Sequence, residues 1–586
     1  MSTTPPPMSP RSAEINLHTG VSRAVDLMWD NKPDEAEKIL EKKKDTNPRY
    51  ALEWAHTLLG LMSASNEQRE SMLSRFQHAD NLATANKYGE PMMEFDEDVD
   101  QAMMDAANED MSQLSDKEKA KLQKAQEKQR EKDKEEYKKR VKAAAKSGEN
   151  AGNLWKLECD VIYADALLVR SIVQLTLNSY MRGGINLRKT WGCYYALMAE
   201  VEKDKDDEIT PEVKNNIKYG CGVFYTYLAL VPAGLMKLLS AIGFISDKEL
   251  GEQYLTDVLN SDTIRTPFAA LVLCTYYLFL PTGLGNVNTT LSKAKIVLDK
   301  MNEKYPNNSY FWGYLNFYHR KRGETQEAVA AIEKASANAL AANAVPTLLR
   351  YLLADTLYMD LQFAEAKAKY TAVLDLLEES GETFAYTGQI VISLAACNVM
   401  LGDKAAAVTW LKRVNSMYNP KSKQDANSPK FATRVLNDLK LLPLIGVYVL
   451  YINRDLAHMQ PAQVDKLNVA LTEVTKDEDM TSFEVRGMYK LFQGVMHKGC
   501  KRPDEAREAW QEVMGFEKKL SSSSAVLPYL YYEMGELEYR QGDLPKAKQY
   551  FDKGAALKGD GHETLANRYS IASKQLKREM AEKEGK

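Results

Sequence analysis

Apolar residues recur every three or four positions along most of the chain, and short breaks at glycine, proline, asparagine and aspartate separate these stretches. This spacing places apolar side chains on one face of an α-helix. No segment shows sustained alternation of apolar and polar residues, which would indicate a half-buried strand. The pattern therefore predicts an all-α protein, with early helices at about 16–30, 33–45, 153–180, 184–202 and 211–230.

Self-similar helix pairs recur in the second half of the chain. A tetratricopeptide repeat has bulky residues at positions 4, 7 and 24 and small residues at 8, 20 and 27. Residues 309–342 and 528–561 fit this pattern, and three weaker copies lie between them. The matching residues are Trp312, Leu315, Ala328, Ile332 and Ala335; Leu353, Ala354, Ala366, Tyr370 and Val373; Leu394, Ala395, Gly402, Ala407, Leu411 and Val414; Gly494, Ala506, Trp510 and Val513; and Tyr531, Met534, Gly535, Gly542, Ala547, Phe551 and Gly554. The pattern predicts a tetratricopeptide-like α-solenoid of antiparallel helix pairs.

These repeats are longer than the usual 34 residues. The alanines at position 20, Ala328, Ala366 and Ala407, are 38 and 41 positions apart, which predicts an irregular superhelix. The gap between Ala407 and Ala506 leaves room for a further helical unit that includes FATRVLNDLKLLPLIGVYVLYI. A stack of this kind has a concave surface, through which we expect it to bind other proteins.

The most apolar part of the chain is an uncharged run of 18 residues, 219–236. Its length is close to the ~20 residues of a membrane-spanning helix. However, Pro232 interrupts the run, and Ser246 and Glu249 have the spacing of a capping box that starts another helix. These signals favour a buried helical hairpin at 219–244 over a membrane span, and both interpretations stay open.

Charge is concentrated in the segment 90–150. Glu90 to Asp116 contains ten acidic residues and no Lys or Arg, whereas Asp116 to Lys142 contains 12 basic and 7 acidic residues. Such a composition cannot bury an apolar helix face, so we predict a charged insertion that is helical or disordered. It is either a solvated surface segment or a basic arm that contacts anionic lipid or RNA.

The overall composition is that of a soluble globular protein, with 44% hydrophobic and 27% charged residues. The net charge of −4 argues against a general nucleic-acid binder. The 586 residues exceed what one compact core usually holds, so several parts are expected. The predicted parts are a disordered N-terminus (1–13), N-terminal helices (14–89), the charged insertion (90–150), a helical region with the apolar hairpin (151–300), tetratricopeptide-like repeats (301–575) and a charged tail (576–586).

No residue constellation indicates a reaction. The chain lacks a phosphate-binding loop, an H-E-x-x-H motif, a G-x-S-x-G motif and any C-x-x-C pair. Its six cysteines lie in apolar helical contexts, which favours buried small side chains over nucleophiles or metal ligands. They are Cys159, Cys193, Cys221, Cys274, Cys397 and Cys500. The seven histidines are scattered, and we expect solvent or capping roles for them. They are His18, His56, His78, His319, His458, His497 and His562. We therefore predict no enzyme, no cofactor and no metal site, in a chain that starts without a signal peptide and is expected in the cytoplasm.

Three other features have both a structural and a functional interpretation. Gly220 and Gly222 form a lone G-x-G without a preceding strand, so close helix packing explains them better than a dinucleotide loop. Arg265, followed by Thr266 as a predicted N-cap and Pro267, is either a buried polar anchor or a partner contact, and we favour the anchor. Repeat positions 5 and 9, which grip a partner's C-terminal carboxylate in some tetratricopeptide domains, lack the required Lys and Asn. They hold Gly313 and Phe317, Tyr351 and Asp355, Ile392 and Ala396, Leu491 and Val495, and Tyr532 and Glu536.

Two groups of residues together resemble a family signature. The first comprises Tyr219, Gly220, Gly222, Phe224, the turn from Pro232 to Leu239, Gly243, Phe244, Asp247, Glu249 and Gly251. The second comprises MRGGINLRKTWGCY (181–194), Arg265, Pro267, Tyr276, Tyr277, Tyr305 and Pro306. They resemble the inclusion body clearance protein family, whose animal members are called tetratricopeptide repeat protein 39, and the resemblance covers most of the chain outside 90–150.

The resemblance implies a helical-repeat scaffold or adaptor that mediates protein–protein interactions without known catalysis. It also implies a connection with inclusion clearance, lipid droplets or sterol homeostasis, in the cytoplasm and peripherally at lipid droplets or the mitochondrial outer membrane. It transfers no binding residues. The alternative hypothesis is a lipid-binding or peripheral membrane protein, associated with lipid droplets, that uses the hairpin 219–244.

Overall fold

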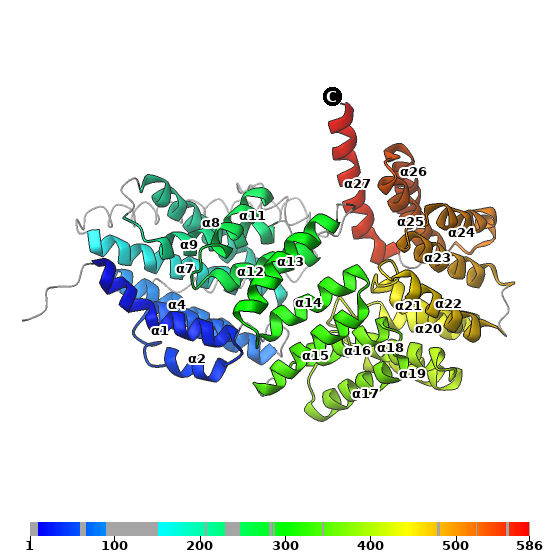
Figure 1. The fold of residues 1–586 in the computed structure, drawn as a ribbon, viewed down its shortest axis with the longest axis horizontal. Coiled ribbons are helices and arrows are strands. Elements are labelled where there is room, and N and C mark those ends of the chain that lie inside the picture. The colour runs from blue at the N-terminus through cyan, green and yellow to red at the C-terminus, as the bar shows by residue number, and fades with distance from the viewer. Residues whose placement is uncertain are drawn as a thin grey trace, which may run out of the picture. The chain divides into compact units, whose positions relative to one another are not determined.

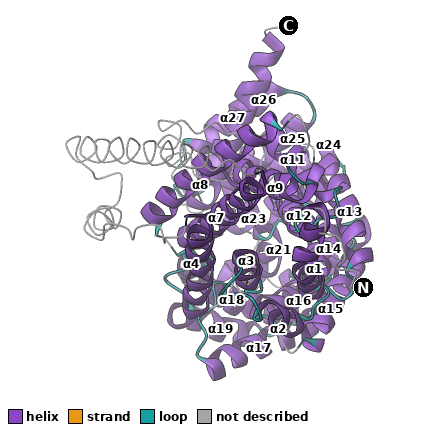
Figure 2. Ribbon diagram, turned by 90° about the vertical axis from the view of Figure 1, so that its left-hand side faces the viewer, coloured by secondary structure: helices purple, strands orange, loops and turns teal. Residues whose placement is uncertain are grey.

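The computed structural model describes residues 10–58, 66–88, 150–177, 179–204, 208–228, 247–279, 284, 287–342, 345–476, 481–522, 524–557 and 562–584. Within these ranges the chain forms helices, turns and loops and no strand, which confirms the all-α prediction (Figure 1, Figure 2). The charged insertion up to residue 149 and residues 229–244 of the predicted hairpin lie outside the described residues. Contacts divide the chain into two compact units, Met1–Leu273 with Tyr305–Asn307 and Cys274–Lys304 with Asn308–Lys586.

The first unit consists of consecutive helices that pack against each other in pairs. They are α1 (Pro10–Trp29), α2 (Pro33–Leu40), α3 (Pro48–His56), α4 (Asn66–Tyr88), α7 (Asn150–Thr176), α8 (Tyr180–Lys203), α9 (Pro211–Leu228), α11 (Lys248–Leu259) and the start of α12 (Thr266–Phe279). Each predicted helix in this region is present. The second one is shorter than predicted, because it ends at Leu40 and residues 41–46 form turns.

Glycines allow α9 to lie in close contact with two neighbouring helices. A Cβ atom on Gly222 would lie 2.7 Å from Cγ of Leu255 and 3.1 Å from the carbonyl oxygen of Gly251 on α11. A Cβ atom on Gly220 would overlap the ring of Tyr194 on α8. The prediction that the lone G-x-G serves close helix packing is therefore confirmed.

Two predicted helix starts differ from the structure by about one residue. The N-cap of α11 is Asp247, whose side chain accepts a hydrogen bond from the Leu250 N–H at 2.9 Å, so the predicted capping box of Ser246 and Glu249 is wrong. Helix α12 begins at Thr266 itself, and the Thr266 hydroxyl accepts from the Thr263 N–H at 2.9 Å. In both cases the pattern located the helix, but side-chain geometry decided the cap.

The second unit begins at the end of α12. Its helices are α13 (Val287–Lys304), α14 (Ser309–Arg322), α15 (Thr325–Ala341), α16 (Thr347–Met359), α17 (Phe363–Ser380), α18 (Thr387–Met400), α19 (Lys404–Met417), α20 (Ser428–Asn437), η2 (Leu439–Leu444), α21 (Ile445–Ile452), α22 (Pro461–Thr475), α23 (Phe483–Gly499), α24 (Pro503–Gly515), η3 (Glu517–Lys519), α25 (Val526–Arg540), α26 (Leu544–Ala555) and α27 (His562–Glu584). The five predicted repeats correspond to the pairs α14/α15, α16/α17, α18/α19, α23/α24 and α25/α26. The further unit predicted in the gap is also present, as α20 to α22.

Small residues hold the paired helices together as the repeat pattern requires. The five alanines at position 20 are fully buried: Ala328, Ala366, Ala407, Ala506 and Ala547. A Cβ atom on Gly494 of α23 would overlap the indole of Trp510 on α24, which is itself fully buried. Gly402, between α18 and α19, has a φ of 84°, a left-handed conformation that favours glycine. Residue identity at these positions therefore sets how closely the helices approach.

The last helix closes the second unit. One face of α27 buries Leu565, Tyr569, Ala572 and Leu576, a spacing that places all four on one helical stripe. The side-chain oxygen of Gln575 accepts a hydrogen bond from the backbone N–H of Leu284 at 3.0 Å. Since Leu284 precedes α13, the first and last parts of this unit are in contact.

Candidate partner-binding face

The inner face of a tetratricopeptide stack is lined by the first helix of each repeat, and positions 5 and 9 belong to it. In the second unit these positions are buried, apart from the half-buried Phe317. The buried residues are Gly313, Tyr351, Asp355, Ile392, Ala396, Leu491, Val495, Tyr532 and Glu536. Side chains that would face a partner in an open groove are therefore covered by the chain itself.

Helix α21 covers part of this inner face. The Tyr358 hydroxyl of α16 donates to the carbonyl oxygen of Gly446 at 2.8 Å, and a Cβ atom on Gly446 would overlap the side chain of Met400 at the end of α18. The Tyr451 ring lies 5.5 Å from that of Phe492 and 5.2 Å from that of Tyr529.

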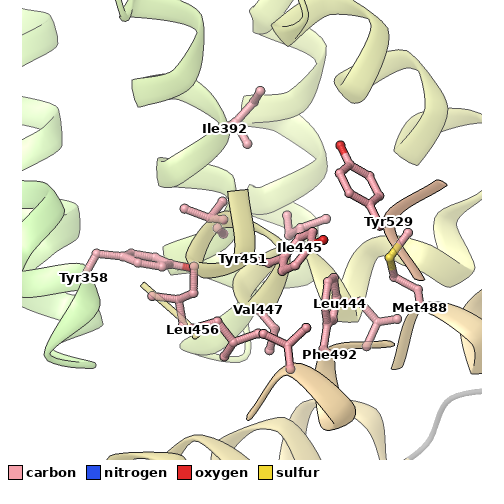
Figure 3. Close-up of a cluster of buried hydrophobic side chains, with 14 of the residues drawn as sticks. Tyr358, Ile392, Leu444, Ile445, Val447, Tyr451, Leu456, Met488, Phe492 and Tyr529 are labelled. Atoms are coloured by element: carbon pink, nitrogen blue, oxygen red, sulfur yellow. The ribbon is translucent and has the colours of Figure 1, made fainter. Parts of the chain in front are cut away.

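The core around α21 draws on helices from several repeats. Figure 3 shows side chains of α16, α18, α23 and α25 gathered around α21. The concave surface open to a partner is therefore smaller than predicted, because α21 packs against the inner sides of these helices.

The segment that connects α21 to α22, residues 453–460, joins repeats that are distant in sequence. One Arg320 Nη2 lies 2.7 Å from Oδ2 of Asp355 and 2.8 Å from Oδ2 of Asp455. The Gln460 amide donates to the carbonyl oxygen of Arg322 at 2.6 Å. Asn453 also donates to Asp355, at 2.9 Å. The connecting segment therefore bonds α14 to α16 across the inner face.

Burial shifts the pKa values of two groups at the connecting segment. Burial raises the pKa of Asp455 to about 6; Arg320 opposes this shift and the Asp355 carboxylate adds to it. Burial, with the nearby Arg454, lowers the pKa of Lys321 to about 8. Two buried carboxylates thus share one arginine, and the pKa of Asp455, on the connecting segment, is raised toward neutral pH.

A second buried ionic cluster joins the later repeats. The Lys498 ammonium of α23 contacts Glu533 and lies 2.7 Å from Oε2 of Glu536, both on α25. The Tyr451 hydroxyl donates to Glu533 at 3.1 Å. Burial alone would lower the pKa of Lys498, but the two glutamates raise it above its ordinary value. The cluster therefore holds its charges in place and ties α21 to α23 and α25.

The first unit contains a network of deeply buried charges. Arg265 is 0% exposed, and its Nη2 lies 2.9 Å from both Oε1 of Glu53 and Oδ2 of Asp165. Arg49 lies 3.3 Å from Glu53 and 2.7 Å from Glu158. Because these residues belong to α3, α7 and the start of α12, the network links helices distant in sequence. The prediction that Arg265 is a buried polar anchor is confirmed.

This network contains a carboxylate beside a histidine, but its geometry does not favour catalysis. The Nδ1 atom of His56 lies 2.8 Å from Oε2 of Glu53, and both side chains are buried. Burial lowers the pKa of His56 more than Glu53 raises it, so the imidazole is neutral at pH 7. Burial opposes ionisation of Glu53, yet Arg265 and His56 hold its pKa below its ordinary value. A general acid or base must reach a substrate proton, and these groups are enclosed.

The cysteines match the prediction of buried apolar side chains in four cases of six. Cys159, Cys221, Cys274 and Cys397 are buried, Cys193 and Cys500 are half-buried, and no disulfide joins any of these six described residues. Burial raises the pKa of Cys159 to about 12. Among the described residues, no group of three His, Cys, Asp or Glu side chains is arranged to hold a metal ion.

The sequence interpretation missed the polar residues that connect repeats. Asn316 occupies the small position 8 of the first repeat, is fully buried, and donates to the Ala328 carbonyl and the Thr356 hydroxyl, both at 2.9 Å. Asp355 is the one charged side chain on the inner face of TLLRYLLADTLYM. The sequence does contain a signal for the contacts of Asn316, because this polar residue occupies a position where the repeat pattern has a packing residue.

The residues that resemble a family signature, between 181 and 306, lie within the range that a known family model matches. The Iml2/Tetratricopeptide repeat protein 39 family model matches residues 60–499. The chain belongs to this family. The family resemblance inferred from the glycine-rich and apolar segments is therefore confirmed, and the match extends from the first unit into the α23 repeat.

Solved helical-repeat structures resemble this family member at low identity. A human IFIT1 dimer with PPP-AAAA is 12% identical, with 84% of this chain and 95% of that chain covered and a TM-score of 0.31. Yeast Tom70 is 11% identical, with 98% and 97% covered and a TM-score of 0.26. The APC/C hetero-tetramer Cut9–Hcn1 is 11% identical, with 96% and 98% covered and a TM-score of 0.23. We draw no functional conclusion from them.

Residues 229–244 of the predicted hairpin lie outside the described residues, so its contact with lipid stays a prediction. Among the described helices, none combines the length and the apolarity that crossing a bilayer requires.

Proposed function

We propose that this protein is a non-enzymatic scaffold or adaptor that binds other proteins through the outward-facing surfaces of its helix pairs. We place it in the cytoplasm, in the clearance of protein inclusions or in lipid- and sterol-linked processes. Membership of the Iml2/Tetratricopeptide repeat protein 39 family supports a repeat protein of this kind. The observation that carries the proposal is the burial of the groove positions, which leaves the exposed side chains on the outer faces of the helix pairs as the accessible surface.

The buried ionic clusters support a structural role for the ionisable residues. Arg265, Glu53 and Asp165 in the first unit, and Arg320 and Asp455 in the second, are buried and paired with one another. Such groups specify how helices pack, whereas a catalytic pair has to contact a substrate. The ionisable groups with the strongest burial therefore serve the fold that presents the binding surface.

Proximity labelling and affinity capture in cells test the proposal. The full chain is compared with Ala407→Asp, which places a charge at a fully buried position between α18 and α19 and disrupts that repeat. We expect a set of proteins recovered with the natural chain and lost with the variant, while Ala330→Asp on the exposed face of α15 keeps them. Recovery of no protein that depends on the folded repeats would overturn the scaffold proposal.

Liposome flotation of the purified chain tests the alternative function. We expect no flotation with neutral or anionic vesicles. Flotation that is lost when residues 229–246 are replaced by a polar linker would contradict the scaffold proposal and favour lipid binding by the hairpin.

A further inference from the structure

The outer face of α19, the turn after it and α20, residues 404–437, carries an excess of positive charge. Between Asp403 and Asp438 there are seven basic residues and one acidic residue, in a chain whose net charge is −4. The basic residues are Lys404, Lys412, Arg413, Lys421, Lys423, Lys430 and Arg434. Lys404 is half-buried, and Arg434 is half-buried with its guanidinium over the rings of Phe431 and Tyr448, so the outward positive charge comes mainly from the other five, which are exposed. We name this surface the basic face.

The single acidic residue of the basic face does not contribute to its surface. Asp425 is 0% exposed. Its carboxylate accepts hydrogen bonds from the backbone N–H groups of Gly388 at 2.7 Å, Gln389 at 3.0 Å and Asn419 at 2.7 Å. The Ser428 hydroxyl donates to it at 2.8 Å. The exposed charges contributed by residues 404–437 are therefore all positive.

Hydrogen bonds to the start of α18 hold the basic face in one conformation. The Ser422 hydroxyl donates to the Ala385 carbonyl at 2.7 Å, and the Gln389 amide donates to the Gln424 carbonyl at 2.6 Å. Helix α20 also packs against both α18 and α19. A partner that binds here meets lysines on a backbone that is already ordered, which reduces the entropy cost of association.

The side chains of the basic face favour a protein partner over a membrane or a nucleic acid. Residues 404–437 expose no large apolar side chain, and the nearest exposed ones, Leu401 and Leu439, lie outside this range. Insertion into a bilayer needs an exposed apolar surface. The one tryptophan, Trp410, is half-buried, with the Arg413 guanidinium 4.5 Å from its ring, so it offers no open platform for stacking bases.

We propose that the basic face docks an acidic segment, rich in Asp and Glu, of a partner protein. This inference rests on the proposed scaffold function and names the partner chemistry of one of its outward-facing surfaces. Lysine ammonium groups are point charges on flexible stems, so they adapt to carboxylates at different spacings. Complementary charge across such a surface increases the rate of association and selects against basic partners.

A charge-reversal experiment on the full chain tests this proposal. The probe is a fluorescein-labelled peptide of ten glutamates separated by glycine and serine, and binding is followed by fluorescence anisotropy at 50 mM and 200 mM salt. In the test variant Lys412, Lys421 and Lys423 become Glu. In the matched control Lys334, Lys574 and Lys577, which are exposed lysines of other helices in the same unit, become Glu. Thermal unfolding of both variants establishes that they are folded.

We expect the test variant to bind the peptide at least about tenfold more weakly at 50 mM salt, and the control to change its affinity by less than about twofold. We also expect the salt dependence to decrease in the test variant alone, because fewer charges are then neutralised on binding. Equal weakening by both variants would overturn the proposal, since affinity would follow net charge and not the basic face.

Two further arms compare other anionic partners. Phosphatidylserine vesicles or a single-stranded RNA oligonucleotide that bind the basic face more tightly than the peptide would overturn the choice of an acidic protein segment. Cellular partners that still depend on the folded repeats, but are unaffected by the charge reversal, would overturn this inference and leave the scaffold proposal standing.

Discussion

Arg265 and Glu53 are 212 positions apart in the chain, yet Nη1 of Arg265 donates to Oε2 of Glu53 at 3.0 Å in a site without solvent exposure. The Arg265 guanidinium also contacts Asp165, so one side chain joins the start of α12 to α3 and α7. Burial alone would lower the pKa of Arg265, but Glu53 and Asp165 raise it above its ordinary value. The arginine thus stays charged, and its removal leaves two carboxylates buried without it.

We expect Arg265→Met to lower the free energy of unfolding of the first unit by about 3–5 kcal/mol, because breaking a buried ion pair leaves uncompensated charge. The stability of Arg265→Lys should lie between that of the natural chain and that of Arg265→Met, since an ammonium keeps the charge but cannot reproduce the forked contact of a guanidinium. Urea unfolding followed by circular dichroism measures the loss. Lys218→Met provides the control, because it removes a partly exposed ion pair with Asp257 and should cost at most about 1 kcal/mol. Equal effects of the two Met variants would contradict a structural role for the buried network.

The contact between Gly220 and Tyr194 yields a steric prediction. Gly220→Ala places a methyl group against a fully buried tyrosine ring, whose hydroxyl donates to Asp165 at 2.5 Å. We expect a loss of about 1–3 kcal/mol in the free energy of unfolding, because the ring has to move and its hydrogen bond is strained. Gly192→Ala, on α8 with nothing within 4 Å, should raise stability by up to about 1 kcal/mol through helix propensity. If both substitutions raised the thermal midpoint, the close approach of α8 and α9 would be wrong.

The buried Asp425 predicts a local effect at the start of α18. Asp425→Asn removes one acceptor oxygen from the backbone N–H groups of Gly388 and Gln389, so we expect their hydrogen exchange to accelerate at least tenfold. The free energy of unfolding should fall by about 1–3 kcal/mol, the typical cost of leaving buried donors without a partner. The control is Asp403→Asn, an exposed N-cap that accepts from the Ala406 N–H at 2.9 Å, where asparagine caps almost equally well. Unchanged exchange at Gly388 would show that Asp425 does not fix this turn.

The helix pairs of this fold could be predicted from local sequence because their determinants are local. Ala328 and Ile332 lie one turn apart on one helix, and the pattern that contains them repeats within about 40 positions. Periodicity therefore found the five repeats and five helices of the first unit, α1, α2, α7, α8 and α9. Caps were less predictable, since Asp247 and Ser246 both suit an N-cap, and only the hydrogen bond from the Leu250 N–H to the Asp247 side chain distinguishes them.

The covered inner face could not be predicted in the same way. The sequence of α21 is compatible with any buried helix, and its location depends on contacts such as Tyr358 to Gly446, which are 88 positions apart. The same holds for Arg320, whose partner Asp455 is 135 positions away. A single sequence contains no signal for such pairings, whereas a buried-face acidic residue in a largely apolar helix, such as Asp355, indicates that a partner exists.

The shared arginine of the connecting segment predicts a pH dependence. The pKa of Asp455 is raised from its ordinary 3.8 to about 6, so between these values the folded protein binds a proton that the unfolded chain has lost. Its contribution to stability is therefore fully present below about pH 4 and is lost as the pH rises through about 6. Asp455→Asn stays neutral and should gain stability relative to the natural chain by about 1–3 kcal/mol between pH 4.5 and pH 7. Urea unfolding of both proteins across this range measures the difference.

Asp355→Asn distinguishes this titration from a general loss of the cross-link. Asp355 accepts from Arg320, from the Tyr370 hydroxyl at 3.2 Å and from the Asn453 amide at 2.9 Å, so its replacement leaves several buried donors with a weaker acceptor. We expect Asp355→Asn to lower the free energy of unfolding at both ends of the pH range, by about 1–3 kcal/mol. A stability difference between Asp455→Asn and the natural chain that does not change with pH across this range would show that Asp455 is ionised throughout. Arg320 would then outweigh both the burial and the neighbouring carboxylate, and the connecting segment would be held by two full ion pairs at every pH tested.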